Sequence, residues 1–229
     1  MKKSLLAVFI AVVVSIPALA GDVATFVDLG FSPDSAYFMF GQYGVDEASS
    51  SPYAETYLVD NKKNDFVRGG VAKKSFPARL EPGQDASGAF YALFADQSSL
   101  ARKYRIDHLM PGRLLYILVD GQEPPASLSF RDFKTGASYE VSLSQKTAES
   151  GGTVSSSFGI AATRTAKDGA AKRVVGGNPD IKRPGVKEYV IRRIIAAPDE
   201  KTLVFIVEKR MKDKSGGAIR YMIETLRLP

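Results

Sequence analysis

Two copies of a strand-turn-strand pattern stand near the two ends of the chain. Residues 29–41 contain a Pro-Asp pair at Pro33, and residues 194–206 repeat the pattern around Pro198, 165 positions later. Proline fixes φ and aspartate favours a turn, so each copy predicts a β-hairpin. An aromatic-aliphatic-aliphatic-acid piece follows each copy, at residues 57–60 and 221–224. Self-similarity in a fixed order is typical of β-rich arrays, and it constrains the fold rather than the chemistry.

Three blade-like units follow from this pattern, at about residues 26–70, 113–143 and 188–228. The middle unit is a more divergent copy, in which the turn at Asp132–Gly136 corresponds to the turn at Asp60–Asn64. Each unit reads as short β-branched or aromatic runs separated by turn residues.

One segment, about residues 86–105, has a different period. Its apolar residues Phe90, Leu93, Phe94, Leu100 and Tyr104 recur at intervals of three and four, which predicts an amphipathic helix that covers a sheet.

The fold class predicted is therefore mainly β, with antiparallel sheets arranged as propeller-like blades or as a β-sandwich, and one helix. Removal of 20 residues from the N-terminus would leave 209 of the 229 residues, which we assign to a single domain at 21–229. That length is too short for a propeller of six or seven blades of about 40–45 residues each.

The N-terminus predicts a secretory signal peptide over residues 1–20. Lys2 and Lys3 precede an apolar run of about a dozen residues, and the small residues Ala18 and Ala20 are placed for cleavage. The alternative is an uncleaved anchor, but the run is shorter than the roughly 20 residues that span a bilayer. We therefore expect a secreted or periplasmic protein that does not span the membrane after cleavage.

Residues 144–187 are rich in Ser, Thr, Gly, Ala and Lys, and apart from a possible short strand at 156–163 we expect a flexible basic loop there. The basic residues in and beside this segment have two interpretations: a solvated surface, or a binding site for phosphate groups, anionic lipid or an acidic partner protein. The candidate binding residues are Lys172, Arg173, Lys182, Arg183, Arg192 and Arg193.

No residue pattern predicts a catalytic centre. The chain has no cysteine and a single histidine, His108, and it lacks a Gly-x-Ser-x-Gly elbow. It also lacks the glycine-rich nucleotide-binding motifs and the Asp-x-Asp-x-Asp-Gly calcium loop. We therefore expect no cofactor, no metal and no nucleic-acid partner.

The hairpin at Phe31–Asp34, with the downstream strand Tyr57–Asp60, resembles the blade motif of TolB-type periplasmic propellers. In addition, the segment Gly21–Asp34, with Phe40–Gly44 and the later Arg183–Val186, resembles a family of predicted secreted bacterial proteins, found in spirochaetes among others, whose function is unknown. The second resemblance implies secretion and transfers no catalytic residue.

Two functions of different classes remain open. The first is a non-enzymatic binding protein that recognises an envelope protein or an anionic envelope component through loops of a β scaffold. The second is a carboxylate-dependent hydrolase of glycan or peptide. A hydrolase would need two carboxylates in one pocket. The candidates are Asp28, Asp34, Glu55 and Asp60.

Overall fold

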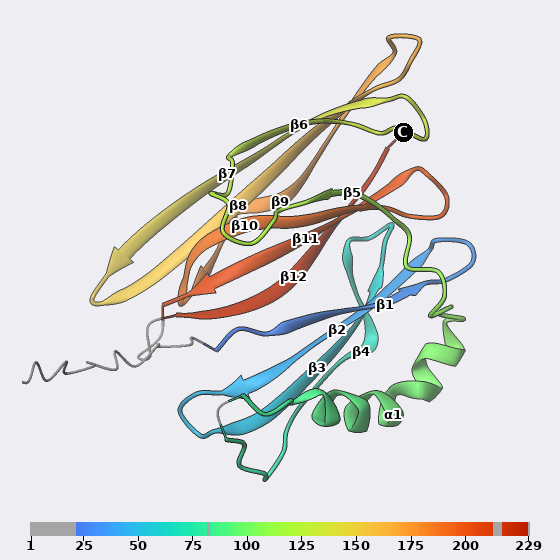
Figure 1. The fold of residues 1–229 in the computed structure, drawn as a ribbon. Helices are drawn as coiled ribbons and strands as arrows, with labels where there is room; N and C mark the ends of the chain where they lie inside the picture. The colour runs from blue at the N-terminus through green and yellow to red at the C-terminus, as the bar shows by residue number, and fades with distance from the viewer. Residues whose placement is uncertain (1–21, 82, 213–216, 229) are drawn as a thin grey trace, which may run out of the picture.

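The computed structural model describes residues 22–81, 83–212 and 217–228, so the expected signal peptide lies outside the described residues. The described chain forms three four-stranded antiparallel sheets and a single helix (Figure 1). The prediction of a mainly β fold with one helix is confirmed.

The first sheet has the order β1 (Thr25–Phe31), β2 (Tyr37–Asp46), β3 (Ser51–Asp60), β4 (Asp65–Ser75). The middle sheet has the order β12 (Ala218–Arg227), β11 (Thr202–Met211), β10 (Val186–Ala196), β5 (Arg113–Ile117). The third sheet has the order β6 (Ser127–Arg131), β7 (Ser138–Ser150), β8 (Thr153–Thr165), β9 (Ala171–Pro184). The helix α1 spans Ser87–Lys103, close to the range expected for it.

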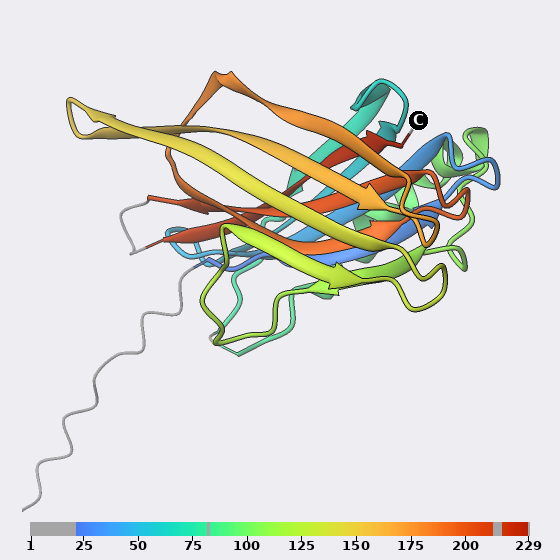
Figure 2. The ribbon, with the colours of Figure 1, turned by 90° about the horizontal axis from the view of Figure 1, so that it is seen from above.

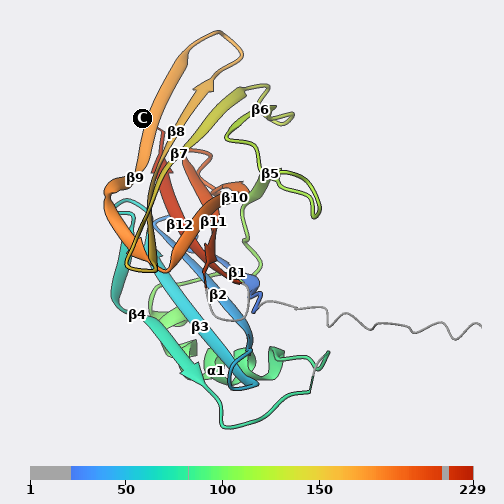
Figure 3. The same ribbon diagram turned by 90° about the vertical axis from the view of Figure 1, so that its left-hand side faces the viewer.

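These elements form four successive layers: the helix, the first sheet, the middle sheet and the third sheet (Figures 1 and 3). Each junction between layers holds one apolar cluster. Phe90 and Leu93 of α1 pack on Met39 and Leu58 of the first sheet. The other face of that sheet packs on the middle sheet, whose opposite face packs on the third.

The middle sheet is covered on both faces, which explains the sequence of β11. Successive side chains of a strand point to opposite faces. Val204 and Ile206 belong to the cluster shared with the first sheet, whereas Phe205 and Val207 belong to the cluster shared with the third. Both sets must be apolar, so β11 reads as a continuous hydrophobic run instead of an alternating one.

The two Pro-Asp copies form equivalent hairpin turns, one between β1 and β2 and the other between β10 and β11. In the first turn Ser32 N–H donates to the Tyr37 carbonyl, and in the second Ala197 N–H donates to the Thr202 carbonyl. The residue after each Pro-Asp pair has a left-handed backbone, with φ of 56° at Ser35 and 55° at Glu200. The predicted repeat of the hairpin is confirmed.

The match between residues 57–60 and 221–224 does not hold in the strand register. Phe40 is opposite Tyr57 in the first sheet, whereas the corresponding Phe205 is opposite Glu224 in the middle sheet. Tyr57 therefore corresponds in position to Glu224 and not to Tyr221. The two similar pieces are therefore displaced by three residues relative to each other in their sheets, because the β-strand register is set by packing between layers.

The largest correction concerns residues 144–187, which we expected to be a flexible loop. They form the second half of β7, all of β8 and β9 and the start of β10, and the tip of the β7–β8 hairpin projects past the other strands (Figure 2). In β8 the residues Phe158, Ile160 and Ala162 alternate and are buried. In β9 Gly176 allows close packing, since a Cβ there would lie 2.3 Å from Cδ2 of Leu226.

The unit predicted at 113–143 is also divided between two sheets. Its first strand, β5, pairs with β10 in the middle sheet, whereas β6 and β7 belong to the third sheet. The other two units correspond to the first sheet and to the remaining strands of the middle sheet.

Candidate functional site

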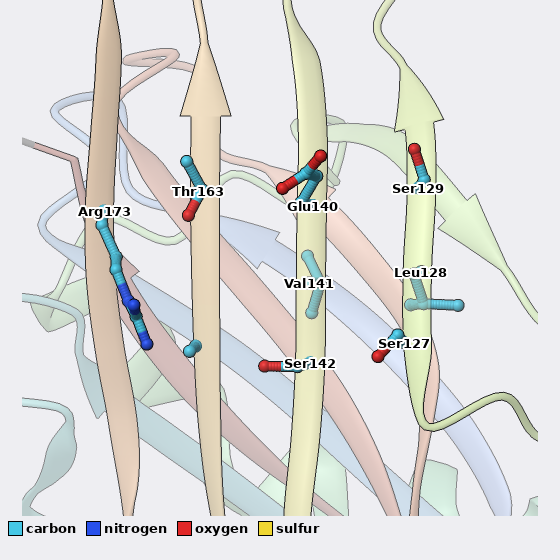
Figure 4. Close-up of a pocket in the computed structure, with 9 residues that line it drawn as sticks. Ser127, Leu128, Ser129, Glu140, Val141, Ser142, Thr163 and Arg173 are labelled. Atoms are coloured by element: carbon cyan, nitrogen blue, oxygen red, sulfur yellow. The ribbon is translucent and has the colours of Figure 1, made fainter.

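The outer face of the third sheet carries a shallow groove across all four of its strands (Figure 4). The inner face of this sheet packs on the middle sheet, so alternate residues are left to face outward. The cavity is about 400 Å³ and is open to solvent. The outward side chains that line it are Ser127, Ser129, Glu140, Ser142, Ala161, Thr163 and Arg173.

The strand register places four of these side chains in one row. Ser129 is opposite Glu140, Glu140 is opposite Thr163, and Thr163 is opposite Arg173. Strands in a sheet lie about 4.8 Å apart, so the backbones of Glu140 and Arg173 are separated by about 10 Å. The carboxylate and the guanidinium therefore stand on either side of a hydroxyl.

The charged groups of Glu140 and Arg173 have no partner in the described part of the fold. Within the part of the chain that the structure describes, neither side chain forms a hydrogen bond or an ion pair, and both are exposed. The groove thus offers an acceptor, a cationic donor and several hydroxyl groups to a ligand. A guanidinium binds carboxylate or phosphate in a bidentate manner, and a carboxylate binds hydroxyl or amine donors.

The six basic residues singled out from the sequence do not form one surface. Arg173 lies in the groove, and Lys172 is its neighbour on β9. Lys182 is exposed near the end of β9. Arg183 turns inward, where its guanidinium lies 5.3 Å from the centre of the Phe158 ring.

The two arginines of β10 lie elsewhere. Arg192 forms ion pairs with Asp120 and with Glu208, and it is half-buried. Arg193 lies over the Phe26 ring at 5.8 Å. The structure therefore brings none of the other five residues into the groove that Arg173 lines. Sequence reasoning did not identify the remaining groove residues, because their grouping depends on how β7, β8 and β9 pair, and β9 was expected to be part of a loop.

A comparison with known protein families agrees with the sequence resemblance to a family of predicted secreted proteins. The model of a family described as predicted secreted protein (DUF2259) matches residues 39–227. The chain belongs to this family. The expected secreted or periplasmic location is therefore confirmed. No curated protein and no solved structure matched the chain in the corresponding searches.

The described residues of this member of the DUF2259 family contain no helix that is both long and apolar enough to cross a membrane. The same residues contain no group of three or more His, Asp or Glu side chains that could hold a metal ion.

The four carboxylates that a hydrolase could use do not lie together. Asp34 and Asp60 accept backbone N–H groups in two different hairpin turns. Glu55 is held by Gln42, Tyr57 and Lys73 on the inner face of the first sheet. Asp28 is on the same face but two strands away, because it is opposite Phe40, which in turn is opposite Tyr57.

His108 has a structural role. Its Nδ1 lies 2.7 Å from the Leu29 carbonyl, and its ring packs edge-on against Phe94 of the helix. The histidine thereby ties the segment after α1 to strand β1. Because its Nδ1 is paired with a backbone carbonyl and not with a carboxylate, His108 does not form a catalytic triad.

The buried carboxyl of Asp28 gives a prediction about stability and pH. Burial raises its pKa to about 6, although the Gly30 N–H and Arg193 act in the opposite direction. A carboxyl whose pKa is higher in the folded state makes the fold less stable as pH rises from about 4 to 6. We expect Asp28→Asn to raise the free energy of unfolding by about 3 kcal/mol at pH 8 and to change it little at pH 4. Urea denaturation at both pH values measures this, and an equal effect at both would contradict it.

Proposed function

We propose that this secreted protein is a non-enzymatic binding protein that holds a polar envelope component in the groove of the third sheet. The observation that carries the proposal is the unused pair of Glu140 and Arg173, which lie on either side of the Thr163 hydroxyl in a groove that also contains three serines. Charged side chains without partners on an exposed sheet cost the fold little and remain available to a ligand.

The chemistry of the groove indicates the kind of ligand. An anionic group would bind Arg173, and hydroxyl or amine groups would bind Glu140 about 10 Å away. The groove wall contains no exposed aromatic anchor of the kind that dominates most protein–protein interfaces. A cell-wall polymer that carries carboxylate, amine and hydroxyl groups fits this arrangement better than a folded protein partner does.

The test is co-sedimentation of the mature protein with isolated cell-wall polymer. We expect Arg173→Gln and Glu140→Gln each to weaken binding about tenfold, since a charge-assisted hydrogen bond contributes about 1.5 kcal/mol or more. Binding of the native protein should also fall as salt rises.

Lys146→Gln is the matched control. Lys146 is exposed on the same face of β7, about 20 Å along the strand from Glu140, and its side chain forms no hydrogen bond or ion pair among the described residues. The Lys146→Gln variant should bind cell-wall polymer as the native protein does. Unchanged binding of both groove variants, or equal loss in all three, would overturn the proposal.

A further inference from the structure

A second group of charged residues lies where the three sheets meet, away from the groove. Lys209 of β11 is directly opposite Arg220 of β12 and, on its other side, opposite Tyr189 of β10. Opposite residues share a face, so these two cations point to the same side of the middle sheet. Arg183 of β9 lies over the same Tyr189 ring, with its guanidinium 6.0 Å from the ring centre.

The first sheet adds a further cation. Lys73 of β4 forms an ion pair of 3.1 Å with Glu55, and its side chain is 58% exposed. Beside it an open cavity of about 400 Å³ is lined by Tyr53, Glu55, Lys73 and Arg220, among other residues. We call Lys73, Arg183, Lys209 and Arg220 the cationic cluster.

The acidic residues near the cluster are already engaged. Glu55 accepts hydrogen bonds from Gln42 and Tyr57 in addition to its pair with Lys73. Asp22 is bonded to Arg220 and, at 3.0 Å, to the Tyr53 hydroxyl. Asp46 lines the same cavity, where its carboxylate attracts Arg220 and its Oδ1 accepts hydrogen bonds from Ser49. Three carboxylates thus face four cations, and each of them already accepts hydrogen bonds.

Two of the four cations lack an anionic partner. Among the described residues Lys209 forms no ion pair or hydrogen bond, and a terminal nitrogen of Arg183, Nη1, is buried without a hydrogen-bond partner. Burial lowers the pKa of Lys209, and the charges of Lys73, Arg183 and Arg220 lower it further, whereas Glu55 acts to raise it. Like charges opposite each other and unpaired buried donors both cost stability.

We propose that the cationic cluster is a binding site for an oxyanion, that is, a phosphate, sulfate or carboxylate group. Such a group would neutralise the repulsion between Lys209 and Arg220 and would accept a hydrogen bond from Arg183 Nη1. Two guanidinium groups and two ammonium groups match the several oxygens of a phosphate. The aromatic ring of Tyr53, under Arg220 at 4.4 Å, holds one guanidinium in place.

Inorganic phosphate is the probe, titrated at constant ionic strength against sodium chloride. We expect saturable binding by calorimetry and an upward shift in the pKa of the Lys209 ammonium, followed by NMR. Lys209→Met should weaken phosphate binding at least tenfold, and Lys209→Arg should retain it. The methionine variant should fold, because it keeps the apolar stem and removes a charge that faces other cations.

Lys212→Met is the control, since Lys212 follows the same strand but is paired with Glu149 at 2.6 Å. It should bind phosphate as the native protein does. A phosphate effect no larger than that of chloride would overturn the proposal, and so would unchanged affinity in Lys209→Met.

A second arm distinguishes the source of the anion, with vesicles of phosphatidylcholine alone or mixed with phosphatidylglycerol. Given phosphate binding, Lys209-dependent attachment to the mixed vesicles supports a lipid headgroup, and no attachment supports a soluble ligand. Binding of cell-wall polymer in the groove should be unchanged in Lys209→Met, so this proposal and the proposed function can fail separately.

Discussion

Replacement of Asp132 by alanine is expected to lower the free energy of unfolding by about 3 kcal/mol. Asp132 is buried and accepts hydrogen bonds from Arg113 at 2.6 and 3.1 Å, from Lys134 N–H and from the Thr135 hydroxyl. Arg113 also binds Glu200 of the β10–β11 turn. The network therefore links the middle and third sheets, and its loss leaves Arg113 half-buried with one partner fewer.

The ion pair of Asp132 with Arg113 also predicts that the stability of the fold depends on pH. Burial acts to raise the pKa of Asp132, but the hydrogen bonds from Arg113, Thr135 and Lys134 outweigh it and lower the pKa to about 2. A carboxyl with a lowered pKa stabilises the fold above its unfolded value of about 4, and that contribution is lost as pH falls through 2. The difference between native protein and Asp132→Ala should therefore shrink below pH 4, as measured by chemical denaturation.

Asp60→Ala provides the control for Asp132. Asp60 occupies the corresponding place in the β3–β4 turn and accepts the N–H groups of Lys62 and Lys63, but it is linked to no arginine. Its replacement should cost about 1 kcal/mol. Equal losses for the two variants would mean that the ion pair adds nothing beyond the turn.

Gly30→Ala is expected to destabilise the protein by about 3 kcal/mol or more. Gly30 lies in β1 next to a bulge, with a φ of 94°, and a Cβ there would be 2.1 Å from the Asp107 carbonyl oxygen. A non-glycine residue at positive φ costs about 1–3 kcal/mol, and the clash is with backbone that cannot rotate away. Thermal and urea denaturation measure the loss.

Gly69→Ala separates the cost of the positive φ from the cost of the steric clash. Gly69 in β4 has a φ of 74°, but no atom lies within 4 Å of the position of its Cβ. Its replacement should cost about 1–2 kcal/mol, from the backbone conformation alone. If Gly30→Ala costs no more than that, the contact between β1 and the segment after the helix is weaker than the geometry indicates.

Local sequence features were sufficient for the parts of the fold that are set by near neighbours along the chain. The Pro-Asp pairs at Pro33 and Pro198 predicted two hairpins. Both turns have equivalent backbone hydrogen bonds and a residue with left-handed backbone directly after the Pro-Asp pair. The spacing of Phe90, Leu93 and their neighbours predicted the helix, because one face of a helix must be apolar to cover a sheet.

The third sheet was predicted only in part, for a physical reason. Strand β9 has most of its polar residues exposed and meets the core through Val174 and Gly176, so it has little hydrophobic alternation. Its formation depends on hydrogen bonds to β8, and glycines that look like loop residues in sequence serve here for close packing. In β8 the alternation of Phe158, Ile160 and Ala162 was a usable signal.

The sequence by itself determined secretion, the antiparallel β class, the hairpin repeat and the helix, because each depends on composition or on short periodic patterns. Tertiary structure alone decided which charges meet. Arg173 and Arg183 lie on one strand, yet one reaches the groove with Glu140 and the other reaches the cluster with Lys209. Side-chain direction alternates along a strand, and β9 contains a bulge between the two arginines, so only the strand register could separate them.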